Sequence, residues 1–201
     1  MAFGDSLTVG HQSPIWEDEL PEPTPYTRFL KKKVDELLKQ KGAIGVRVEF
    51  LNRGINGELT DDMVDRFDRD VLGPRPDFVI ILGGSNDLGW GVDPTAVAAN
   101  LANMYGEALR HEVKPVACTV PSVLGYDEGI QPRLQLNQTI KRLSAEFGIT
   151  CVDLFSATND SSGRLRKEYS NDGLHLSTKG YEAMADAIFS GAVRGIVSEF
   201  L

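Results

Sequence analysis

The run Phe78–Leu82 constrains the fold of this chain most, because all of its residues are apolar. A strand with one face in water alternates apolar and polar residues, whereas a continuous run is typical of a strand that helices cover on both faces. Residues 46–51 alternate before ending apolar, as a strand does. Residues 115–120 and 149–152 are similar runs but less decisive, because each contains a threonine. These runs predict a parallel sheet between two layers of helices.

Helical patterns separate the predicted strands, and their ends carry recognisable signals. Proline suits a first turn, Asp and Ser suit an N-cap, and glycine suits the residue after a helix. The expected ends lie at Pro25 and Gly42, at Asp93 and Pro94, at Gly148, and at Ser177 or Thr178.

The composition is that of a globular protein and excludes several classes of partner. The chain has 201 residues and a net charge of -8, which argues against nucleic acid and against stable association with an anionic membrane. Cys118 and Cys151 lie in apolar runs and are expected to be buried, reduced thiols. No cluster of Cys and His predicts a metal site. No leader is recognisable, so we expect a cytoplasmic protein unless a leader precedes the sequence.

Serine chemistry is suggested by two short motifs near opposite ends of the chain. Ser6 lies in Gly4-Asp5-Ser6-Leu7, and His175 lies in Asp172-Gly173-Leu174-His175. A serine hydroxyl is a weak nucleophile until a base removes its proton, and a histidine oriented by a carboxylate does this near neutral pH. The chain therefore contains a candidate nucleophile, base and orienting group.

These two motifs and two further polar segments follow predicted strands. Sites in parallel α/β sheets form where the carboxyl ends of the strands meet. We therefore expect one edge of the sheet to gather residues 4–6, 52–57, 83–87 and 172–175.

In this order the four segments resemble the blocks of the GDSL esterases, also called SGNH hydrolases after their Ser, Gly, Asn and His. Gly4-Asp5-Ser6-Leu7 matches the nucleophile block, residues 52–60 resemble the second block, Gly84-Ser85-Asn86-Asp87 matches the third, and Asp172-Gly173-Leu174-His175 matches the last. The resemblance spans nearly the whole chain. It implies a single domain over residues 1–201, with a three-layer α/β/α sandwich and a five-stranded parallel sheet in the order 2-1-3-4-5.

The resemblance also implies a role for each motif residue and requires no cofactor. Ser6 attacks an ester carbonyl, His175 acts as general base and then general acid, and Asp172 orients the imidazole. The oxyanion is held by the backbone N–H groups of Ser6 and Gly57 and by the side-chain amide of Asn86. Each such donor is worth about 2.7–4 kcal/mol of barrier lowering.

Structural alternatives exist for three of these residues. Asp172 is also suited to capping the last helix, and Asn86 to capping its own loop. Gly54 competes with Gly57 for the second donor position.

The other polar residues of the motifs are interpreted as structural. Asp5 is expected to stabilise its turn and Asp87 to anchor its loop. His11 and His111 are expected to be bystanders, although His11 lies in a loop that can rim the site.

Three aromatic residues in the predicted edge loops are candidates for lining the substrate pocket: Trp16, Trp90 and Tyr126. An aromatic ring there can stack on a sugar or line an acyl groove, or it can simply pin its loop. No long apolar segment indicates a lipid-binding lid. We therefore expect a small-molecule ester as substrate, with a short acyl group such as O-acetyl.

Two other readings remain open. A thioesterase or lysophospholipase uses the same catalytic set, and a binding module can keep the fold without activity. The sequence does not determine the oligomeric state.

Few residues are available to form the first strand. Only Met1, Ala2 and Phe3 precede the Gly-Asp-Ser turn, and a typical strand has about 5–6 residues. In the order 2-1-3-4-5 this strand is interior, so a short one leaves neighbouring backbone groups unpaired, at about 1–3 kcal/mol for each buried group. We expect either a very short first strand or further native residues upstream of Met1.

Overall fold

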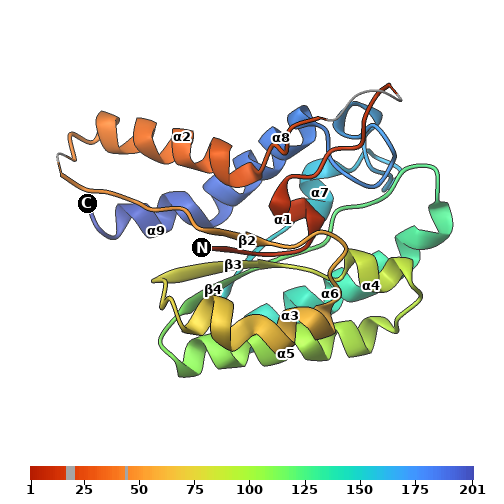
Figure 1. Cartoon of the computed structure of the whole chain (residues 1–201), viewed down its shortest axis with the longest axis horizontal. Coiled ribbons are helices and arrows are strands. Elements are labelled where there is room, and N and C mark those ends of the chain that lie inside the picture. The colour runs from red at the N-terminus through yellow and green to blue at the C-terminus, as the bar shows by residue number, and fades with distance from the viewer. Residues whose placement is uncertain (17–20, 44) are drawn as a thin grey trace.

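The computed structural model describes residues 1–16, 21–43 and 45–201, and its centre is a parallel five-stranded sheet in the order β2-β1-β3-β4-β5 (Figure 1). The predicted sheet and strand order are confirmed. The strands are β1 (Ala2–Gly4), β2 (Asn52–Gly54), β3 (Phe78–Leu82), β4 (Lys114–Cys118) and β5 (Thr150–Val152).

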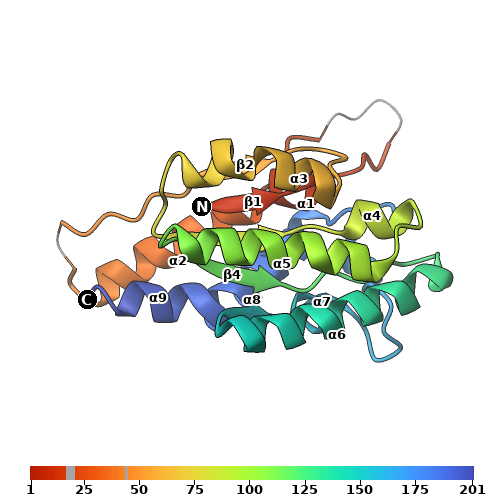
Figure 2. The ribbon, with the colours of Figure 1, turned by 90° about the horizontal axis from the view of Figure 1, so that it is seen from below.

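Helices cover both faces of the sheet, as the apolar run in β3 predicts (Figures 1 and 2). One layer contains α2 (Tyr26–Gln40), α8 (Thr178–Ile188) and α9 (Arg194–Ser198). The other contains α3 (Thr60–Phe67), α5 (Pro94–Arg110) and α6 (Ile130–Phe147). The remaining short helices and turns are α1 (Ser6–Val9), α4 (Ser85–Gly89), α7 (Leu154–Thr158), η1 (Asp68–Leu72), η2 (Asp127–Gly129), η3 (Lys167–Tyr169) and η4 (Phe189–Val193).

The long helices end where their sequence signals indicate. The carboxylate of Asp93 accepts a hydrogen bond from the backbone N–H of Thr95 at 2.7 Å and caps α5. Gly148 has a φ of 66° and ends α6, and the side chain of Ser177 caps α8. No described helix has the length and apolar character needed to cross a membrane.

The strand predicted at residues 46–51 is wrong in its position. The paired residues are Asn52–Gly54, because β1 has only three residues and these lie opposite Asn52, Arg53 and Gly54. The backbone of Leu51 still accepts a hydrogen bond from the N–H of Ala2 at 2.8 Å. Apolar alternation makes 46–51 suitable for a strand, but a strand forms only where a neighbour supplies hydrogen-bond partners.

The first strand is short and interior, as expected. β1 pairs with β2 on one side and with β3 on the other, and Ala2 and Phe3 are buried. Because β1 ends at Gly4, the Ser6 turn lies at the carboxyl edge of the sheet. α4 follows β3 at this same edge (Figure 1).

Both cysteines are free thiols. Cys118 is buried and Cys151 is half-buried, and burial raises the pKa of each thiol. The prediction of a buried thiol is therefore confirmed for Cys118, whereas Cys151 is more accessible than predicted.

Candidate active site

The proposed nucleophile begins a one-turn helix directly after β1. The carboxylate of Asp5 caps α1 by accepting a hydrogen bond from the N–H of Leu7 at 2.9 Å. Gly10 ends the helix with a φ of 84°, and its N–H donates to the carbonyl of Ser6 at 3.0 Å. The turn holds Ser6 at the sheet edge, and the predicted structural role of Asp5 is confirmed.

The proposed base and its carboxylate form a compact loop before α8. Nδ1 of His175 lies 2.7 Å from Oδ2 of Asp172, and Oδ1 of Asp172 accepts the backbone N–H groups of Leu174 and His175 at 2.8 and 2.7 Å. These hydrogen bonds hold the pKa of the Asp172 carboxyl well below its usual range against the opposing effect of burial. With Nδ1 engaged, Nε2 is the nitrogen left to accept a proton.

Gly173 makes this loop possible. Its φ is 84°, and a Cβ at this position would lie 2.2 Å from the carbonyl oxygen of Leu124. The N–H of Leu124 also donates to the carbonyl of Gly173 at 2.8 Å. The close approach fixes the loop against the segment that follows β4.

The nucleophile turn and the base loop are joined by residues 11–13. The rings of His11 and His175 meet edge to face with their centroids 4.6 Å apart, and the hydroxyl of Ser13 donates to Oδ2 of Asp172. Asn171 donates to the carbonyl of Ser13 at 3.0 Å. The N–H of His11 donates to the carbonyl of Ser6 at 3.0 Å, so a continuous chain of contacts links the two motifs.

His11 is therefore not the bystander that the sequence predicts. Desolvation and the neighbouring His175 lower the pKa of His11, and Asp172 partly offsets this. His111, in contrast, is an exposed residue at the end of α5.

The two remaining oxyanion candidates are Gly57, in the loop after β2, and Asn86, in the short helix α4 after β3. Nδ2 of Asn86, in α4, donates to the carbonyl of Glu58 at 2.9 Å. An amide nitrogen carries two hydrogens, so one stays available to a ligand. Gly57 has a φ of 76° and open space around its Cα, whereas a Cβ on Gly54 would lie 2.5 Å from a backbone nitrogen of α1. Gly54 is therefore needed for the close packing of β2 against α1, whereas Gly57 lies in an open loop beside Asn86.

Two buried polar contacts fix these loops. Asp87 accepts hydrogen bonds from the backbone N–H of Thr60 at 3.1 Å and from its hydroxyl at 2.5 Å, which confirms Asp87 as a loop anchor. The guanidinium of Arg66 makes a two-pronged ion pair with Glu58 and donates to the carbonyl of Gly4 at 3.2 Å. Arg66 thus ties the end of β1 to the loop that carries Gly57.

Two further ionisable groups are buried near the nucleophile. Burial raises the pKa of the Asp5 carboxyl to about 7, although the capping bond and His175 oppose this rise. Burial also lowers the pKa of Arg133 to about 10, and its guanidinium donates to the carbonyl of Gly129 at 3.0 Å and the hydroxyl of Ser85 at 3.2 Å.

The GDSL-like lipase/acylhydrolase family matches residues 2–183, which is most of the chain. The chain belongs to this family.

Comparison with individual proteins shows how far the similarity extends. A lipase/acylhydrolase from Enterococcus faecalis has a TM-score of 0.76 and 27% identity, covering 98% of this chain and 94% of its own. An acetylxylan esterase from Geobacillus stearothermophilus has a TM-score of 0.73 and 22% identity, covering 94% of this chain and 91% of its own, and so shows the fold alone.

An arylesterase from Vibrio mimicus is 32% identical over 104 residues, which is 52% of this chain and 45% of that protein. The chain spans about half the length of the curated relatives that it matches.

The aromatic candidates for the pocket of this GDSL-family chain are all exposed. Trp16 is 74% exposed, Trp90 81% and Tyr126 56%. The tryptophan rings bury too little surface to anchor their loops in the core. Contact with substrate remains a prediction for all three residues.

Sequence reasoning missed several residues that build this GDSL-type site. Ser13 and His11 carry no local signal, because their partners lie more than 150 residues away in sequence. Arg66, in contrast, does carry a local sequence signal. It shares the buried face of α3 with Met63 and Phe67, and an arginine among buried apolar positions is expected to have a specific partner.

Proposed function

We propose that this chain is a serine ester hydrolase that cleaves short acyl esters through an acyl-enzyme on Ser6. The observation that carries the proposal is the contact network that joins the nucleophile turn to the Asp172–His175 pair. Nδ1 of His175 faces Asp172, so Nε2 can take the hydroxyl proton while the carboxylate stabilises the imidazolium.

The proposed reaction has two halves that use the same groups. The oxygen of Ser6 attacks the ester carbonyl as its proton moves to His175, and collapse of the tetrahedral intermediate returns that proton to the leaving alcohol. Water then attacks the acyl-serine with His175 again acting as base. In both halves the N–H groups of Ser6 and Gly57 and the amide of Asn86 stabilise the negative oxygen.

The preference for short acyl groups rests on the proteins that this chain resembles. Similarity to an arylesterase and to the fold of an acetylxylan esterase supports acetyl as the acyl group.

The first test is hydrolysis of p-nitrophenyl acetate by wild type, Ser6→Ala and the control Ser198→Ala on α9. We expect Ser6→Ala to lose essentially all turnover and Ser198→Ala to match wild type. A fluorophosphonate should label Ser6. Labelling of a different serine would overturn the assignment of Ser6 as the nucleophile. A wild type that hydrolyses the ester no faster than Ser6→Ala would favour a binding module.

A panel of substrates then defines the acyl preference. We expect the rate to fall along p-nitrophenyl esters from acetyl to palmitoyl. A maximum at long acyl chains would favour a lysophospholipase, and preference for acyl thioesters would favour a thioesterase.

A further inference from the structure

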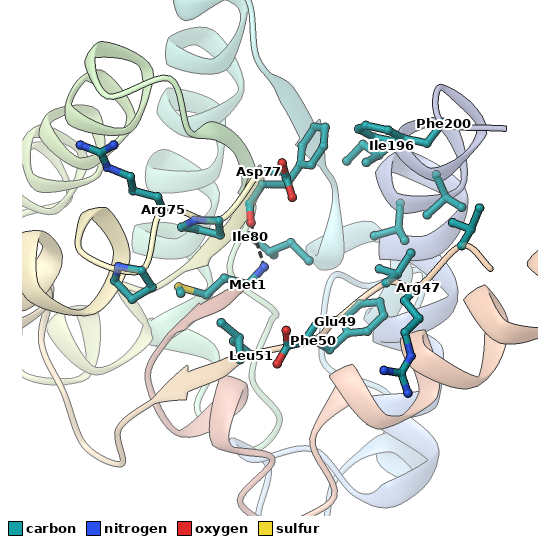
Figure 3. Close-up of a pocket in the computed structure, with 17 residues that line it drawn as sticks. Met1, Arg47, Glu49, Phe50, Leu51, Arg75, Asp77, Ile80, Ile196 and Phe200 are labelled. Carbon is teal, nitrogen blue, oxygen red and sulfur yellow. Dashed lines mark hydrogen bonds between the residues drawn. The ribbon is translucent and has the colours of Figure 1, made fainter.

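A groove and a buried cation are features of the molecule that the proposed reaction does not use. The groove, of about 450 Å³, lies at the amino edge of the sheet, with Met1, Phe50 and Phe200 in its lining (Figure 3). Its lining includes none of the candidate catalytic residues. The cation is Arg133, and it contacts α4, the helix that carries Asn86. It is therefore the feature that bears on the site.

The guanidinium of Arg133 lies inside the protein, next to the third motif. Arg133 belongs to the buried face of α6 and is only 2% exposed. One Nη donates to the hydroxyl oxygen of Ser85 at 3.2 Å, and the other donates to the carbonyl of Gly129 at 3.0 Å. Its Nε is also buried and has no hydrogen-bond partner within the part of the chain that the structure describes. Because Ser85 directly precedes Asn86, the guanidinium lies close to the residue that carries the oxyanion amide.

The charge of Arg133 is not neutralised by direct contact. Both of its acceptors are neutral, and no carboxylate of the described residues forms an ion pair with it. Arg66, which is also buried, is instead paired with Glu58. Burial lowers the pKa of Arg133 to about 10, partly opposed by Tyr126 and Asp5, so the side chain stays cationic at neutral pH.

This position disfavours a cation on two grounds. Taking a guanidinium out of water costs free energy that a carboxylate would normally offset. Arg133 also lies in the first turn of α6, where the helix dipole is positive and opposes a further positive charge. Proteins tolerate such costs chiefly at functional sites. A negative charge that exists only during the reaction would complete this arrangement.

We propose that Arg133, held by Ser85 next to Asn86, supplies a fixed positive charge that stabilises the oxyanion. The proposal rests on the proposed function, because the carbonyl oxygen becomes negative only when Ser6 attacks the ester. In the protein interior a fixed charge acts over a longer distance than in water. The ester is neutral and the tetrahedral intermediate is negative, so the charge should raise kcat with little effect on KM. Because Arg133 is buried and acts at a distance, it is a positioning residue.

The test compares wild type with Arg133→Met, Arg133→Gln and Arg133→Lys in the hydrolysis of p-nitrophenyl acetate. Methionine and glutamine remove the charge, and glutamine keeps a donor for Ser85. For both variants we expect kcat to fall about 10–30-fold with KM within about twofold of wild type, a smaller loss than for a direct oxyanion donor. Lysine keeps the charge and should retain at least about a third of the wild-type kcat. The matched control Arg142→Met removes an exposed arginine from the same helix and should match wild type.

Two further readouts separate this role from a purely structural one. The thermal midpoint of Arg133→Met should stay level or rise, because an apolar side chain of similar volume often replaces a buried charge without loss of stability. A boronic acid forms an anionic tetrahedral adduct with a serine hydroxyl. It should bind Arg133→Met more weakly by the same factor as kcat falls, since the adduct carries the charge of the intermediate.

Several results would overturn the proposal. A wild-type kcat in Arg133→Gln would show that the charge is not needed, and a loss in Arg133→Lys as large as in Arg133→Gln would show that a charge is not enough. These two polar variants decide the question even where Arg133→Met does not fold. A loss of kcat that accompanies a loss of thermal stability and leaves the boronic acid affinity unchanged would indicate a structural role instead. The proposed function fails separately, when wild type hydrolyses the ester no faster than Ser6→Ala.

Discussion

Replacing Arg66 by Met tests the idea that one buried ion pair holds the loop that carries Gly57. The side chains of Arg66 and Glu58 are only 6% and 5% exposed. Methionine keeps most of the volume of arginine but removes every donor, so the carboxylate of Glu58 stays in the interior without its partner.

The expected loss of stability is large. Breaking a buried pair by removing one partner costs about 3–5 kcal/mol, because the remaining charge has lost both water and counter-charge. The carbonyl of Gly4 and that of Arg53 lose a donor as well. At about 2–4 °C per kcal/mol, the thermal midpoint should fall by roughly 6–20 °C.

Urea and thermal unfolding followed by circular dichroism measure this loss. The matched control is Lys31→Met, which breaks the exposed pair with Asp35, where both side chains are more than half exposed. That change should cost no more than about 1 kcal/mol. In the double variant Glu58→Leu with Arg66→Met no unpaired charge remains, so it should recover most of the stability.

The result that refutes this reasoning is specific. If Arg66→Met costs no more than Lys31→Met, the carboxylate of Glu58 is not held by the ion pair. If the double variant is less stable than Arg66→Met, the loss comes from packing rather than from an unpaired charge.

Three further predictions concern individual groups at the catalytic edge. Ser13→Ala removes a hydrogen-bond donor from the carboxylate of Asp172 and should lower kcat/KM about 5–20-fold without unfolding the protein. Ser13→Thr keeps a hydroxyl and should restore the rate. Equal rates for wild type, Ser13→Ala and Ser13→Thr would count against a role of Ser13 in holding Asp172. Asp5 keeps its proton in the folded state up to a pKa of about 7, so stability should decrease as the pH rises from about 4 to 7, by at most about 1.4 kcal/mol per pH unit. Asp5→Asn should lose that component in urea titrations at several pH values, and parallel curves for the two proteins would contradict it. Gly54→Ala would place a Cβ 2.5 Å from a backbone nitrogen of α1 and should lower the free energy of unfolding by about 2 kcal/mol or more. In the control Gly89→Ala the new Cβ meets open space, so stability should be almost unchanged. Similar unfolding midpoints for the two variants would show that α1 can move aside.

The sequence predicts the elements whose structure depends mainly on residues close together in the chain. The apolar run of β3 predicts its bounds, since a strand covered on both faces needs no alternation. Capping is equally local, and Asp93 and Ser177 begin their helices as expected. The spacing of Asp172 and His175 is enough for one carboxylate to accept backbone N–H groups and contact the imidazole.

Predictions failed where structure depends on a distant partner. Residues 46–51 have the pattern of a strand, yet pairing begins at Asn52 because β1 is short. No spacing rule brings Ser13 to Asp172 or His11 to His175, since these contacts form only once the two ends of the chain meet. Residue type alone marks Trp16, Trp90 and Tyr126 as pocket candidates, but whether such a ring contacts a ligand depends on loop geometry.

The interior position of β1 has a consequence for the order of assembly. Both of its neighbours, β2 and β3, follow it in the chain, and the base loop comes after all five strands. A growing chain therefore presents its nucleophile segment before the strands that flank it, and cannot enclose that segment until β3 has emerged. Pairings this distant in sequence slow folding, because loops must close before their contacts form. We infer that the candidate site at Ser6 is complete only after the base loop has been synthesised.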